Sequence, residues 1–304
     1  MVQEPRARET PTTGDWTMRR RDVLAAGSAA LLGLATFPCG WVAAASKRRQ
    51  RVLYFTRSVE YEHSVVRPGE DGLSHSGRIL TQLGRRAGFD VECTKDGSVF
   101  DGDLQRWDVF VFYSCGDMFQ TSVRKRPPMS PAGRDRLVAA VAAGKPFVAL
   151  HSACYWGRQA PADDPYLAMI GARFVAHGAQ QEATMRVASP GFPGTEGLPK
   201  SFRLTDEWYA LRDFADNLHV ILVQETAGME GDMYQRPPFP ATWARMHGQG
   251  RVFFCSMGHR EDVWTNRIFQ QILLGGIAWA LGNAQANTTP NIHQVTPRAN
   301  QLHP

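Results

Sequence analysis

Short apolar runs alternate with amphipathic stretches through the first half of the chain. Continuous apolar runs are typical of strands that are buried on both faces of a parallel sheet. The predicted strands of this half are residues 52–56, 89–93, 108–113 and 147–150. The predicted helices are residues 76–87, which stop at Gly88, and residues 130–143, with Ser130 as N-cap and Pro131 in the first turn. This alternation predicts an α/β fold with a doubly wound, mostly parallel sheet.

The second half of the chain has a less regular pattern. It predicts strands at residues 184–188, 220–224, 241–245 and 251–256, with a turn at residues 246–250. A closing helix is expected at residues 267–281. Residues 283–304 are rich in Asn, Pro and Gln and have no apolar period, so they predict a polar tail that is either disordered or draped over the surface.

Residues 1–45 have the pattern of a twin-arginine signal peptide with an N-terminal extension. Arg19 and Arg20 precede residues 24–37, which are uncharged and rich in Ala, Gly and Leu. This stretch is shorter than the roughly 20 residues that span a bilayer, so no stable membrane anchor is expected. Small side chains before Ser46 predict cleavage after Ala45 and a periplasmic or secreted protein. The alternative is that the stretch forms a buried Ala-rich helix of the fold.

The charge and length of the remaining chain limit the function further. The net charge of the 304 residues is +5, but much of it lies in the signal and in residues 47–51, so the rest is close to neutral. Nucleic-acid binding is therefore not expected. Residues 46–282 are long enough for a single domain with a substantial core. The oligomeric state is not predicted.

The cysteines beyond the signal show no spacing typical of a metal site. They are Cys93, Cys115, Cys154 and Cys255. The last three lie in or just after predicted strands, which favours buried free thiols, although an exported protein can also form a disulfide.

Polar residues gather where the predicted strands end. Ligands of open parallel sheets bind beyond the carboxyl ends of the strands. The residues expected there are His63 and His75 after the first strand, His151 and Ser152 after the fourth, and His259 after the last. Asp206 and Glu207 add two carboxylates. Together these side chains predict a mixed metal site or an acid–base pair, and the alternative is a set of structural histidines.

The order of several motifs resembles the ThuA-like family, which is named for trehalose utilisation. The motifs are residues 149–153, Trp156, residues 172–177, residues 206–209, residues 250–254 and residues 258–264. The resemblance covers residues 51 to 281 and implies a flavodoxin-like sheet related to class I glutamine amidotransferases. The chain departs from the family pattern at His177-Gly178 and Ser189-Pro190, where the family has His-Pro. A role that needs the second of these histidines is not expected.

Glutamine hydrolysis is not expected. In the related amidotransferases a strand-to-helix elbow presents a nucleophilic Cys, and here the elbow position carries His151. Cys154 lies three residues further on, where a helix would turn it away from the elbow.

The first functional hypothesis is an exported enzyme that acts on a disaccharide or a 3-keto glycoside. The chemistry would be that of a lyase, hydrolase or isomerase, with His151, Glu207 and His259 as catalytic residues. A divalent Zn, Mn or Co held by His63, His151 and His259 is the one cofactor expected. The predicted sugar-binding residues are Ser152, Tyr155, Trp156, Asp206 and Tyr209. The second hypothesis is a non-catalytic domain that binds a carbohydrate or a protein.

Overall fold

The computed structural model describes residues 48–303 of the chain. The predicted signal peptide at residues 1–45 lies outside the described residues. Within residues 48–303, no helix is both long enough and apolar enough to cross a membrane.

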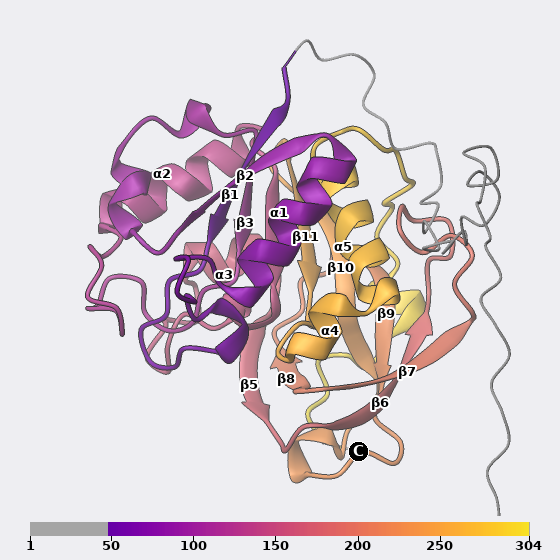
Figure 1. Ribbon diagram of the computed structural model, residues 1–304. Helices are drawn as coiled ribbons and strands as arrows, with labels where there is room; N and C mark the ends of the chain where they lie inside the picture. The colour runs from indigo at the N-terminus through magenta and orange to yellow at the C-terminus, as the bar shows by residue number, and fades with distance from the viewer. Residues whose placement is uncertain (1–47, 304) are drawn as a thin grey trace, which may run out of the picture. The chain divides into compact units, whose positions relative to one another are not determined.

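A mixed sheet forms the centre of the described chain (Figure 1). Its nine strands among residues 48–303 have the order β2-β1-β3-β4-β11-β10-β9-β6-β7. Their bounds are β1 Gln50–Phe55, β2 Phe89–Thr94, β3 Val109–Phe112, β4 Phe147–Leu150, β6 Gln181–Val187, β7 Ser201–Asp206, β9 His219–Glu225, β10 Phe239–His247 and β11 Gly250–Cys255. The first five strands in this order pair in parallel, as the apolar runs predict.

The other strand pairs are antiparallel, which makes the sheet more mixed than the sequence predicts. The tight connection between His247 and Gly250 accounts for the first of them, because a turn this short joins only antiparallel strands. The apolar pattern predicts β6, β9, β10 and β11 themselves but carries no information about their direction.

Helices cover both faces of the sheet (Figure 1). One group consists of α1 (His75–Ala87), α4 (Glu261–Thr265) and α5 (Arg267–Ala280), and the other of α2 (Pro131–Ala142) and α3 (Pro165–Ile170). The Ser130 hydroxyl accepts a hydrogen bond from the backbone N–H of Gly133, which confirms the predicted cap of α2. Gly88 ends α1 in the left-handed conformation, as its position predicts.

The sequence did not predict a second, two-stranded sheet. β5 (Arg173–His177) pairs antiparallel with β8 (Tyr209–Arg212), apart from the main sheet. Figure 1 shows the pair below the ends of β10 and β11. Both strands are short and mix polar, aromatic and small residues, so neither has a recognisable apolar period.

The polar tail packs against the rest of the chain and is not disordered. It contains the short helix α6 (Ile292–Val295), and Ile292 and Ala299 are buried. The Asn291 side chain bonds to both backbone groups of Val220 in β9. Amide side chains of this polar segment thus complete backbone hydrogen bonds at the start of β9, which a composition argument does not reveal.

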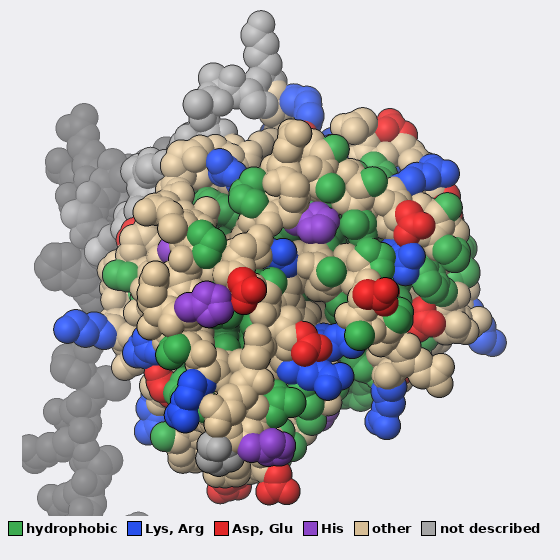
Figure 2. Space-filling model, turned by 180° about the vertical axis from the view of Figure 1, so that it is seen from behind, with side chains coloured by type: hydrophobic (Ala, Val, Ile, Leu, Met, Phe, Trp, Pro, Cys, Tyr) green, Lys and Arg blue, Asp and Glu red, His purple; other side chains and the backbone are tan. Residues whose placement is uncertain are grey.

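The four cysteines of the described chain are free, and Cys115, Cys154 and Cys255 are buried as predicted. Figure 2 shows acidic and basic side chains scattered among apolar ones over one face of the molecule.

Candidate metal site

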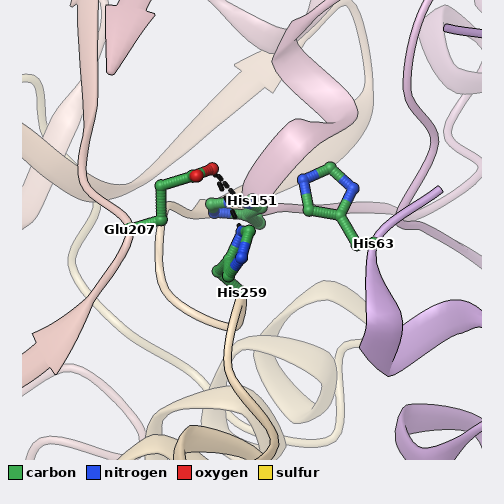
Figure 3. A group of neighbouring side chains, drawn as sticks. All are labelled: His63, His151, Glu207 and His259. Carbon is green, nitrogen blue, oxygen red and sulfur yellow. Dashed lines mark ion pairs between the residues drawn. The ribbon is translucent and has the colours of Figure 1, made fainter. Parts of the chain in front are cut away.

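Four side chains from distant parts of the chain meet beyond the carboxyl ends of the parallel strands. They are His63, His151, Glu207 and His259, and each offers one ligand atom within 4.8 Å of the others. Figure 3 shows the carboxylate of Glu207 directed toward the rings of His151 and His259. All four residues are buried. Three of the four predicted strand-end histidines therefore converge, and the carboxylate of Glu207 joins them.

His151 lies at a sharp turn between β4 and a single helical turn, η5 (His151–Cys154). Its φ of 44° is in the left-handed region, which is uncommon for a residue with a side chain. The ring is held by the carbonyl of Ser256, 2.8 Å from Nδ1. Because a carbonyl only accepts, Nδ1 carries the proton and Nε2 is left with a free lone pair. That Nε2 lies 3.6 Å from Glu207.

Asp206 holds the loop that carries His259. Its carboxylate accepts hydrogen bonds from the backbone N–H groups of Gly258 at 2.7 Å and His259 at 3.1 Å. The sequence predicts Asp206 as a sugar-binding residue; the structure places it fully buried and outside the pocket lining, where it holds the backbone of this loop. Nδ1 of His259 lies 3.0 Å from Glu207.

His63 follows β1 and directly precedes the helical turn η2 (Ser64–Val66). Burial, together with the nearby rings of His151 and His259, lowers its pKa well below the ordinary histidine value. A lowered pKa keeps the imidazole neutral at pH 7, the form that binds metals. Its Nε2 lies 3.4 Å from the Tyr209 hydroxyl.

Three imidazole nitrogens of this cluster lack a well-aligned hydrogen bond within the described chain, although two of them lie 3.0 and 3.6 Å from Glu207. They are Nδ1 of His63, Nε2 of His151 and Nδ1 of His259. Leaving a buried polar atom unpaired costs about 1–3 kcal/mol. A divalent cation would satisfy Nε2 of His151 and Nδ1 of His259, and three imidazoles with a carboxylate are a donor set that Zn²⁺ and related ions accept. The residues therefore fit a metal ion.

His177 adds a fifth side chain at the solvent side of the cluster. Its Nδ1 lies 3.3 Å from Oε1 of Glu207, and its side chain is 44% exposed. Its ring stacks on Tyr209, with 20° between the planes. In the sequence His177 stands out only as part of a motif, because its strand, β5, has no recognisable apolar period. The strand pairing with Tyr209 brings it to the site.

The cluster lies beside an open pocket of about 850 Å³. Among the predicted sugar-binding residues, Tyr155, Trp156 and Tyr209 line it, together with His63, His177 and Glu207. Ser152 does not line the pocket and is fully buried, because the turn at His151 directs the next side chain into the core. Trp208 and Trp264 are fully buried packing residues.

Two other residues named by the sequence lie outside the cluster. His75 opens α1, where its Nε2 lies 3.1 Å from the Glu261 carbonyl. Cys154 is fully buried, and burial raises the pKa of its thiol. A thiol held protonated in the core is a poor nucleophile, in agreement with the expectation that glutamine is not hydrolysed.

The described chain is thus an α/β protein with a mixed sheet and a buried His and Glu cluster beside a pocket. It belongs to the ThuA family, described as trehalose utilisation, whose family model matches residues 51–280. A ThuA-like protein from Bacteroides uniformis is similar at 17% identity over 80% of this chain and 95% of its own, with a TM-score of 0.59. A ThuA-like protein from Parabacteroides merdae is similar at 17% identity over the same shares, with a TM-score of 0.55. A comparison with curated proteins found no significant match.

Proposed function

We propose that this protein is an exported, metal-dependent enzyme that acts on a disaccharide or a 3-keto glycoside. The observation that carries the proposal is the convergence of three buried histidines on one carboxylate at the side of the pocket, where Nε2 of His151 and Nδ1 of His259 face Oε2 of Glu207 without a well-aligned hydrogen bond. A site of this kind is poorly explained by structural histidines, because a structural histidine would have both ring nitrogens hydrogen-bonded.

The bound metal would be held by His63, His151 and His259, with Oε2 of Glu207 close enough to join them. Such an ion polarises a carbonyl oxygen and stabilises negative charge that develops on it. The carbonyl of a keto sugar makes the neighbouring C–H acidic, and a carboxylate can take up that proton. This chemistry leads to elimination, hydration or isomerisation.

The two oxygens of Glu207 support a division of roles. Oε2 faces His151 and His259, whereas Oε1 faces His177 at 3.3 Å. We therefore assign Glu207 as the group that accepts a proton from the sugar. His177 acts as a positioning residue: its Nδ1 donates to the Gly178 carbonyl at 3.0 Å and lies 3.3 Å from Oε1 of Glu207, so it presents an N–H to that oxygen.

Aromatic side chains support a sugar ligand. Tyr155, Trp156 and Tyr209 line the pocket, and Tyr61 also lines it while remaining 56% exposed. Aromatic faces present large apolar surfaces with a polar edge, which suits the mixed faces of a sugar ring. The family's description as trehalose utilisation agrees with this class of ligand.

We also infer a flavodoxin-like origin for the parallel half of the sheet. The order β2-β1-β3-β4-β11 is the order of flavodoxin-like doubly wound sheets, in which ligands bind at the carboxyl edge.

Export by the twin-arginine route is part of the proposal, because that route carries proteins folded around a cofactor. N-terminal sequencing of the protein recovered from the periplasm or medium tests it, with Ser46 as the expected first residue. Retention of residues 1–45 on the recovered protein would contradict it.

Elemental analysis and turnover test the enzyme proposal. Purified protein is expected to hold about one Zn, Mn or Co per chain and to consume 3-keto glycosides. His151→Ala should lose both properties. His293→Ala is the control, because that ring is exposed and pairs with Asp216 outside the pocket. Metal binding without turnover of any 3-keto or ordinary glycoside would reject the enzyme and favour the non-catalytic carbohydrate-binding domain.

A further inference from the structure

The pocket has a second polar end, opposite the histidines. Every residue of β5 lines the pocket, from Arg173 at one end to His177 at the other. The paired strand β8 carries matching residues at its two ends: Tyr209 lies across from His177, and Arg212 lies across from Arg173. The two-stranded sheet therefore connects the metal-binding end of the pocket to an arginine end.

The length of β5 sets the separation of the two ends. Four steps along a strand at about 3.3 Å each amount to roughly 13 Å, or slightly less because a bulge interrupts the pairing between Phe174 and Ala176. This distance exceeds a single sugar ring and matches a ligand of disaccharide length. The pocket volume of about 850 Å³ is within the range of about 300–1,000 Å³ for ligand sites.

The arginine end carries excess positive charge. Arg173 and Arg212 line the pocket there, and Arg158 lines it beside Tyr155, whose ring contacts Phe174, the neighbour of Arg173. Asp213 is the carboxylate next to two of them, at 3.4 Å from Arg173 and 3.5 Å from Arg212. Glu60 lines the pocket too, and it accepts the hydrogen bond of the Tyr155 hydroxyl. Three guanidinium groups thus face two carboxylates.

The three arginines are not equivalent. Arg173 donates to the carbonyls of Pro161 and Ala162 and is largely buried, so it ties the loop after η5 to β5. Arg212 is about half exposed and faces Asp213 in a surface pair, which contributes little energy and leaves donors free. Arg158 is exposed and has no ion pair within residues 48–303, although it lies beside the Tyr155 hydroxyl.

We propose that the arginine end binds an acidic group of the substrate, so that the enzyme acts on anionic glycosides. Arg158 and Arg212 hold the carboxylate, phosphate or sulfate of the distal sugar, while the reacting sugar lies at the histidine cluster. Guanidinium groups suit this task because they present paired donors that match planar and tetrahedral oxyanions. This proposal rests on the proposed function for the identity of the reacting end.

Titration calorimetry on the metal-loaded full chain tests the arginine end directly. The ligands are a neutral disaccharide and three counterparts whose distal sugar carries a carboxylate, a phosphate or a sulfate. We expect at least one anionic ligand to bind about tenfold or more tightly than the neutral one, because hydrogen bonds to a charged group are stronger than those to a neutral group. The ligand that binds most tightly identifies the acidic group that the site prefers, and this preference should weaken with added salt.

Variants assign the preference to the two residues. Arg158→Gln combined with Arg212→Gln should abolish the preference by lowering the affinity for the acidic ligand to that for the neutral disaccharide, and should leave the metal content unchanged. Arg203→Gln is the matched control, because Arg203 is an exposed arginine of β7 that pairs with Glu182 outside the pocket.

The outcomes separate this proposal from the enzyme proposal. Equal affinity for neutral and acidic disaccharides, or a preference that survives the double variant, would overturn the arginine end while leaving metal binding and turnover intact. Loss of metal and turnover, with the arginine-dependent preference retained, would overturn the enzyme and keep the anionic subsite.

Discussion

Asp206 acts on the cluster of His and Glu side chains through the backbone. Its carboxylate accepts hydrogen bonds from backbone N–H groups of the loop after β11, including that of His259. These bonds hold the His259 ring beside Glu207. Buried carboxylates that orient ligands in this way are part of a metal site although they do not touch the ion.

Asp206→Asn should therefore weaken metal binding about 10- to 100-fold, the usual effect of replacing an outer partner of a ligand. The amide keeps the shape but turns a donor toward N–H groups that need an acceptor. Competition with a chelator measures the affinity, and circular dichroism checks the fold. Unchanged affinity in a folded variant would show that the loop holds His259 without this carboxylate.

Lys95 follows β2 and pairs with the buried Glu62, next to His63. Its Nζ lies 3.2 Å from the Glu62 carboxylate and donates to the carbonyl of Thr56. Burial outweighs the attraction of Glu62 and lowers the pKa of Lys95 to about 8. The unfolded chain keeps this proton up to its ordinary pKa near 10.4.

Between pH 8 and about 10.4, the unfolded state thus holds a proton that the folded state has released. The free energy of unfolding should rise with pH across this window, with a slope below about 1.4 kcal/mol per pH unit. The Lys95→Met variant should not show this rise in the free energy of unfolding between pH 8 and about 10.4. Urea unfolding of both proteins at several pH values gives the difference, and parallel curves would contradict the assignment.

At the scale of elements, helix α5 approaches the loop before β7 very closely. A Cβ on Gly275 would lie 2.0 Å from the carbonyl oxygen of Pro193. Backbone cannot yield as a flexible side chain can, so the helix depends on this glycine for its packing beside β11.

Gly275→Ala should lower the free energy of unfolding by about 1–3 kcal/mol, the range for overpacked sites. Gly191→Ala is the control, because its Cβ would meet nothing within 4 Å. It should change stability by less than about 1 kcal/mol. Thermal unfolding of the two variants compares them, and an equal effect would mean that α5 shifts without loss of stability.

At the scale of the whole molecule, the candidate metal site joins segments that are far apart in the sequence. His63 follows β1, His151 follows β4, Glu207 follows β7 and His259 follows β11. An ion bound to all four would therefore stabilise the packing of the whole sheet against unfolding.

Zinc at 100 times its dissociation constant should stabilise the metal-free protein by about 2.7 kcal/mol, and a chelator should reverse this. Magnesium should give no such shift, because it prefers oxygen ligands. Differential scanning calorimetry measures the effect. His259→Ala should show no zinc response, and a full response in that variant would place the ion elsewhere.

Much of the fold was readable from local pattern. The apolar runs located the parallel strands, and Ser130 and Gly88 marked helix ends, since caps depend on neighbouring residues alone. Three features could not be read from local pattern. They are the antiparallel direction of β10, β9, β6 and β7, the small sheet of β5 and β8, and the packing of the tail. They depend on pairings between segments that the local pattern does not encode.

The candidate site divides in the same way. The sequence by itself determined that histidines follow the buried strands, because a parallel sheet delivers its strand ends to one edge. Only the tertiary structure decided which of them meet. It brought Glu207 and His177 to the cluster, excluded His75 and Ser152, and turned Asp206 toward the backbone. The reason is physical: the direction of a side chain at a strand end depends on the turn that follows and on contacts with distant segments.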